Sequence, residues 1–175
     1  MIRYGVLIIC LLFVRAANGQ EFVTLRSVPF TTFTDEIVYI DSIIDERAVK
    51  NLGIHKNLNG EPTTLKLFQG VEESLKHFFN LTLPYDSLGE AITVKVRALN
   101  VQASKRRMND GIAEVARAHV ELVFCKREGG ELKELYTIKH NEDAVFGLYD
   151  KWSVYYTHEQ RIRASLEYCV HAFLR

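Results

Sequence analysis

The sequence predicts an α+β fold in which an antiparallel meander carries two amphipathic helices packed on the sheet. Three successive segments in the second half of the chain alternate apolar and polar residues, which is typical of strands with one buried face. Two further segments, one before and one after these strands, repeat apolar residues with the period of a helix. Because the helices are segregated from the strands, the pattern favours a helix-on-sheet sandwich over a doubly wound fold.

The N-terminus has the features of a cleavable secretory signal peptide. Arg3 supplies a positive charge, and an apolar run follows over residues 5–14. The small residues Ala17 and Gly19 stand at positions minus three and minus one of a cut before Gln20. The apolar run is shorter than the roughly twenty residues that span a bilayer.

Removal of residues 1–19 leaves residues 20–175, a length that fits a single α+β domain. A retained N-terminal anchor is disfavoured because Arg15 interrupts the apolar segment. Cys10 is interpreted as an apolar filler rather than a lipid acceptor, since the bulky Ile9 precedes it. The chain is therefore expected to be exported, to the periplasm or the outside of the cell, with no transmembrane segment in its mature part.

The first half of this domain contains one strand and one helix. Residues 36–45 are rich in β-branched residues on both faces, which predicts an interior strand. Residues 46–64 are mostly polar with several turn formers, and we expect a long connection there. Apolar residues at helical spacing over 71–79 predict an amphipathic helix that Pro84 ends.

The meander follows this helix. Residues 91–98 alternate as a strand, a loop is expected around 105–111, and residues 116–125 alternate again. Gly129-Gly130 predicts a hairpin turn into a third strand over 132–140.

The last element is a predicted helix over residues 158–174. Thr157 and Gln160 have the spacing of a capping box, in which each side chain bonds a backbone amide of the other residue. The apolar stripe that should pack on the sheet comprises Ile162, Leu166, Cys169, Val170 and Phe173.

Composition and motifs argue against several classes of function. The chain has 22 basic and 22 acidic residues, so no global field attracts nucleic acid. The six histidines have no metal-ligand spacing, and neither a Gly-rich phosphate loop nor a nucleophile elbow is present. We expect no metal, no cofactor and no catalytic site, and hence a protein that is not an enzyme.

Two cysteines, Cys125 and Cys169, remain after the signal peptide, in a compartment that permits disulfides. Strict alternation places Cys125 on the strand face opposite Phe124, so a bridge requires the last helix to cover that face. Two interpretations stay open: a disulfide, or two inert thiols that behave as small apolar side chains.

Two charged motifs are candidate sites. Asp45 and Arg47 stand at a strand end, where they are expected to form a structural turn or to contact a partner. Lys105, Arg106 and Arg107 form a basic cluster in the predicted hairpin loop. That cluster is either a solvated tip or a contact for anionic lipid headgroups or an acidic partner.

The strand that ends in Asp45-Glu46-Arg47, the loop with Gly53, the helix and the meander together resemble small bacterial envelope proteins of the YajG-like and ABC-transport auxiliary lipoprotein type. The resemblance covers residues 36–173 in its order of elements. It implies an exported domain with an Asp-x-Arg turn and a helix laid against the sheet. The chain departs from this type because it lacks the lipidation cysteine.

These observations lead to two functional hypotheses, with an enzyme of unrecognised type in third place. The first is an exported envelope protein that binds a partner protein or lipid, as an accessory to transport or to outer-membrane maintenance. The second is a protein that binds a lipid or a small apolar ligand between the sheet and the helices. The second hypothesis requires a cavity lined by Phe78, Phe79, Phe124, Leu166 and Phe173, whereas a filled core favours the first.

Overall fold

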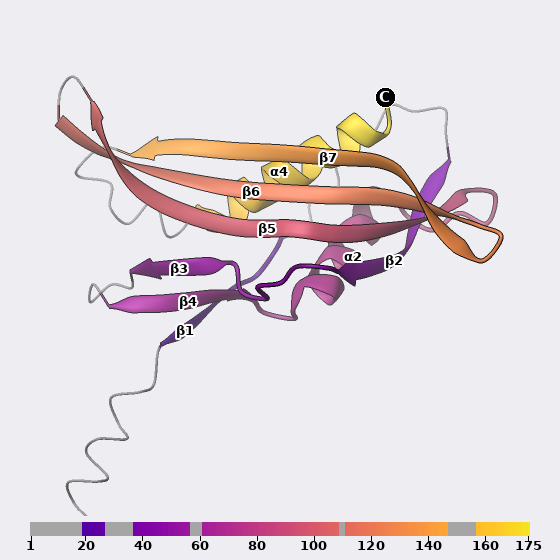
Figure 1. Ribbon diagram of the computed structural model, residues 1–175, viewed down its shortest axis with the longest axis horizontal. Coiled ribbons are helices and arrows are strands. Elements are labelled where there is room, and N and C mark those ends of the chain that lie inside the picture. Colours follow the sequence, from indigo (N-terminus) through magenta and orange to yellow (C-terminus); the bar gives the residue numbers. More distant parts are fainter. Residues whose placement is uncertain (1–18, 27–36, 57–60, 109–110, 147–156) are drawn as a thin grey trace, which may run out of the picture.

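The computed structural model describes residues 19–26, 37–56, 61–108, 111–146 and 157–175. Within these residues the chain forms a three-stranded and a four-stranded sheet, with two helices on the larger one, and this confirms the α+β class (Figure 1). The predicted signal peptide lies almost wholly outside the described residues. The elements are β1 (Gln20–Val23), β2 (Val38–Asp45), β3 (Gly53–Lys56), β4 (Pro62–Leu67), α2 (Val71–Thr82), β5 (Glu90–Met108), β6 (Gly111–Glu128), β7 (Glu131–Phe146) and α4 (His158–Phe173).

The larger sheet has the strand order β2-β5-β6-β7. Its last three strands are antiparallel neighbours, so the predicted meander is confirmed. Gly129 and Gly130 have φ values of 60° and 90° and form the hairpin turn between β6 and β7. The strands are longer than the alternation predicted, because β5 and β6 continue to residues 108 and 111 where a loop was expected.

The prediction of an interior strand before residue 46 was wrong in its position. β2 is an edge strand, and it pairs with β5 in parallel from Val38 opposite Glu90. Val38 and Ile40 are buried, and α2 packs against this strand. Ile43 and Ile44 are only half-buried. β-branched residues on both faces therefore reflect a strand covered by a helix rather than a central one.

The prediction of a long connection over residues 46–64 was also wrong. These residues contain β3 and the beginning of β4, which form the smaller sheet with β1 in the order β1-β4-β3. Thr63, Leu65 and Leu67 of β4 alternate as buried residues. This sheet lies beside β5, with β3 nearest to it (Figure 1).

Helix α2 occupies the predicted range and ends before Pro84. Leu75, Phe78 and Phe79 on its apolar face are fully buried. They join side chains from both sheets in one core, so α2 helps to fix the smaller sheet against the larger.

Helix α4 packs on β6 and β7 through the predicted stripe, and the ring of Phe173 stacks on Phe124 with centroids 4.2 Å apart. The predicted capping box was wrong, because the Thr157 side chain makes no capping bond to the helix backbone. Its hydroxyl instead accepts a hydrogen bond from Nη1 of Arg161. The guanidinium of Arg161, one turn along the helix, thus bonds the Thr157 oxygen that would otherwise have capped the helix.

Candidate functional site

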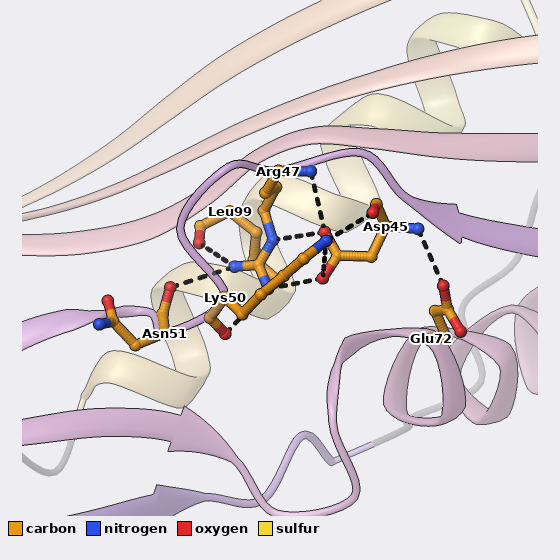
Figure 2. A network of polar contacts seen from close by, with 6 residues as sticks. All are labelled: Asp45, Arg47, Lys50, Asn51, Glu72 and Leu99. Atoms are coloured by element: carbon orange, nitrogen blue, oxygen red, sulfur yellow. Dashed lines mark hydrogen bonds and ion pairs between the residues drawn. The ribbon is translucent and has the colours of Figure 1, made fainter.

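Asp45 and Arg47 form a bidentate pair where β2 ends (Figure 2). Nε of Arg47 donates to Oδ1 of Asp45 at 2.8 Å, and Nη2 donates to Oδ2 at 3.0 Å. The backbone amide of Arg47 also donates to Oδ1. The Asp-x-Arg spacing therefore closes a turn, in agreement with the structural interpretation of this motif.

The guanidinium of Arg47 is buried and has its remaining donors on backbone carbonyls. Nη1 donates to the oxygens of Leu99 and Asn51, and Nη2 donates to that of Lys50. With the two bonds to Asp45, these bonds use all the side-chain N–H groups that arginine has. The bond to Leu99, at 2.8 Å, fastens the turn to β5.

Asp45 lies at the centre of a wider network. Burial raises the pKa of its carboxyl group, but the hydrogen bonds and charge of Arg47 outweigh burial and lower that pKa below 3.8. Nζ of Lys50 donates to the Asp45 carbonyl at 2.7 Å. The Asp45 amide donates to the Glu72 carboxylate, which links the end of β2 to the first turn of α2 (Figure 2).

A β-bulge in β5 lies next to this turn. Val96 pairs with Leu122 and Ala98 with Glu121, so Arg97 is the extra residue. The carbonyl of Val96 bonds the amide of Glu46, which is the last backbone bond between this end of β2 and β5. After the bulge, the backbone N–H and C=O groups of the odd-numbered residues of β5 point away from β6, to the sheet edge where β2 ends.

The smaller sheet meets β5 just beyond the bulge. The amide of Val101 donates to the carbonyl of Leu52 at 2.6 Å. Gly53 follows with a φ of 138°, and a Cβ atom there would lie 2.4 Å from the Val101 carbonyl oxygen. Only glycine allows this close approach of the two backbones.

An open hollow of about 490 Å³ lies at this junction. One wall is residues 97–103 of β5, and the other is the turn after β2 with the beginning of β3. Val49 and Ile54 line it and expose 63% and 66% of their surface. The volume is within the range of small-molecule sites, and the apolar side chains are open to solvent.

The basic cluster lies on β5 a short distance beyond this hollow. The structure places Lys105, Arg106 and Arg107 inside the strand, so the expected loop was wrong for them. The register puts Lys105 opposite Glu114 on β6. The side chains of Lys105 and Arg107 are exposed, and neither makes an ion pair with a described residue.

The structure does not bring Cys125 and Cys169 together. Both thiols are free and fully buried. Phe124 stacks on α4, so Cys125 faces the other side of the sheet, whereas Cys169 belongs to the core beneath the helix. Burial raises the pKa of both thiols, that of Cys169 to about 12. Both cysteines therefore fit the interpretation of inert thiols that behave as small apolar side chains.

A second polar cluster, which the sequence patterns did not predict, lies at the beginning of α4. Nη2 of Arg161 donates to Nδ1 of His158 at 2.6 Å, and both residues are buried. The ring of His55 in β3 lies edge-on to that of His158. Nε2 of His55 lies 3.3 Å from a carboxylate oxygen of Glu21 in β1. His158 and Arg161 are three residues apart on the buried stripe of α4, and this is the signal that would have revealed them.

Burial, reinforced by the charge of Arg161 and by His55, lowers the pKa of His158 to about 3. Because a guanidinium only donates, Nδ1 of His158 must accept and the ring is neutral. Burial also lowers the pKa of Arg161, to about 10. Arg161 is therefore charged at neutral pH.

Two further findings bear on the kind of site. No group of three or more potential metal ligands exists among the residues that the structure describes. Neither described helix has the length and apolar character needed to cross a bilayer.

The comparisons with known proteins provide no family. No family model matches the chain, and no curated protein matches it either.

Proposed function

We propose that the chain is an exported, non-enzymatic protein that binds a partner at the hollow between β3 and β5. The single observation that carries the proposal is this hollow, which combines exposed Val49 and Ile54 with a strand edge and a basic cluster nearby. Its role would be that of an accessory to transport or to outer-membrane maintenance, as the resemblance to YajG-like and ABC-transport auxiliary lipoproteins implies. The place of action would be the periplasm or the outside of the cell.

The packing beneath the helices favours this proposal over the binding of a lipid or small apolar ligand. Phe78, Phe79, Phe124 and Leu166 are fully buried, and Phe173 stacks on Phe124. Side chains packed against one another in this way fill the core, so their surface is not available to a ligand.

Export is part of the proposal. Gln20 is the first residue of β1, so a cut before it leaves this strand whole. Mass spectrometry of the protein from its native source should find Gln20, free or cyclised, at the N-terminus. An intact Met1, or a lipid on Cys10, would contradict export as a soluble domain.

Partner capture from the native envelope tests the binding site. The variant Val49→Ser/Ile54→Ser should keep the wild-type melting curve, because both side chains are exposed, but lose a partner that the wild type retains. Leu88→Ser is the matched control, since Leu88 is 85% exposed outside the hollow. Replacing Lys105, Arg106 and Arg107 by Ser tests the basic cluster in the same way. Capture that neither set of substitutions reduces would overturn the proposal.

A further inference from the structure

We propose that the edge of β5 beyond Val101, which no described strand pairs with, accepts an extended, acidic polypeptide segment as an added strand. This inference rests on the proposed partner-binding function and specifies the conformation and charge of the partner.

The backbone groups of the odd-numbered residues of β5 after the bulge point away from β6. The carbonyl of Leu99 and the amide of Val101 point to the free side, where Arg47 and Leu52 bond them. The register with β6 has no shift between Ala98 and Met108. Ala103 and Lys105 therefore point their amides and carbonyls to the same side. No described strand pairs with them there.

The chain at the beginning of β3 makes one backbone bond to β5, and the pairing goes no further. A parallel ladder that contains the bond from Val101 to Leu52 would next join the Ile54 amide to the Val101 carbonyl. That bond is absent, and no ladder joins these two described strands. Ile54 instead lines the hollow and exposes most of its surface. Among the residues that the structure describes, no strand covers the edge of β5 from Ala103 onward.

An added strand would meet apolar side chains at the hollow and basic side chains beyond it. Val49 and Ile54 offer apolar contacts at the hollow, and Lys105 and Arg107 offer positive charge beyond it. Glu114, opposite Lys105, offsets part of this charge. Backbone bonds give affinity in strand addition, and side-chain contacts select the partner, so the pattern selects an apolar segment with acidic residues.

The other edge of the larger sheet is different. On β7, ion pairs join Lys133 to Glu128, Lys139 to Glu121 and Asp143 to Arg117. A row of charges of both signs blocks unwanted pairing. Charge complementarity therefore assigns the acidic strand to β5.

The test is a titration of the protein, isolated in its native form, with a synthetic peptide of about eight alternating Val and Glu residues, a usual strand length. Binding should slow amide exchange at Ala103 and Lys105 by about tenfold or more, and it should weaken as ionic strength rises from about 0.01 M to 1 M. Ala103→Pro removes the outward amide and should reduce affinity about tenfold, whereas Ala103→Ser should not. A peptide that bears N-methyl groups on alternate residues gives the same test without altering the protein.

Protection elsewhere, or equal binding of the N-methylated peptide, would overturn strand addition. Equal binding of a peptide with Lys in place of Glu would overturn the acidic preference. The proposed function fails separately, since it depends on capture of the native partner through Val49 and Ile54. Strand addition alone would fail if capture needs these side chains while the native partner leaves exchange at Ala103 and Lys105 unchanged.

Discussion

At the scale of single residues, Arg47 explains how the turn after β2 is held. The sequence indicated a turn because a carboxylate and a guanidinium stand two residues apart. It did not indicate the bond to the Leu99 carbonyl, because that residue is 52 positions away along the chain. A local motif therefore predicted the pair, while its role in fastening the turn to β5 depends on the tertiary fold.

Replacing Arg47 should cost more stability than replacing its exposed neighbour Lys50. Arg47→Lys keeps a charge but loses the bidentate geometry and most of the bonds to carbonyls, so we expect a loss of about 3–5 kcal/mol. Lys50→Ala should cost about 0–1 kcal/mol, because the Lys50 side chain is 60% exposed. Denaturant melts of both variants provide the measurement. Equal losses would contradict the account of this turn.

The buried His158 should make stability depend on pH. Its pKa is 6.5 in the unfolded chain and about 3 in the fold, so between these values the unfolded state binds more protons. The free energy of unfolding should therefore fall as the pH drops from 6.5 toward 3. His158→Gln should flatten this slope, since a glutamine has no proton to gain, whereas His77→Gln on the exposed side of α2 should leave it as in wild type.

The measurement is the free energy of unfolding of wild type, His158→Gln and His77→Gln at a series of pH values. A slope in His158→Gln as steep as in wild type would show that other groups cause it. The lowered pKa of Asp45 adds a loss of stability as the pH falls below 3.8. The two effects overlap there, whereas the fall in stability between pH 6.5 and 3.8 belongs to His158.

At the scale of elements, long periodic segments were predictable and short ones were not. The meander and both helices follow apolar repeats that many residues share. β1, β3 and β4 have four to six residues each, which is too few for a period to stand out. Whether a strand lies at an edge depends on its neighbours, which is why the position of β2 was missed.

The meeting of β3 and β5 should depend on Gly53. An alanine Cβ there would lie 2.4 Å from the Val101 carbonyl oxygen, in addition to the strain of a positive φ. Gly70→Ala is the matched control, because Gly70 also has a positive φ but nothing lies within 4 Å of its added Cβ. We expect Gly53→Ala to cost about 1–3 kcal/mol more than Gly70→Ala in thermal or denaturant unfolding. Similar losses would mean that this close approach does not hold the sheets together.

Packing, rather than capping, should hold α4 in place. Leu166 is fully buried, so Leu166→Ala should cost about 2–5 kcal/mol through loss of contacts and a cavity. Thr157→Ala should cost about 1 kcal/mol, the worth of its hydrogen bond with Arg161. Urea melts that rank the two variants in the reverse order would show that the apolar stripe does not carry the helix.

At the scale of the whole molecule, two sheets share one core and meet at the bulge of β5. The charge balance of the chain directs attention away from a global field and toward local features. Asp45, Arg47 and the basic cluster were recognisable as motifs, but the hollow beside them arises from strands distant in sequence. The free edge of β5 lies beside this hollow, and it is the feature on which the proposed strand addition depends.

Amide hydrogen exchange of the chain from residue 20, without any partner, tests that feature most directly. The amide of Val101 is bonded to Leu52, and those of Gln102 and Ser104 point toward β6, so all three should exchange slowly. The amides of Ala103 and Lys105 should exchange much faster than these neighbours. Protection of Ala103 and Lys105 equal to that of Val101 would contradict an open edge.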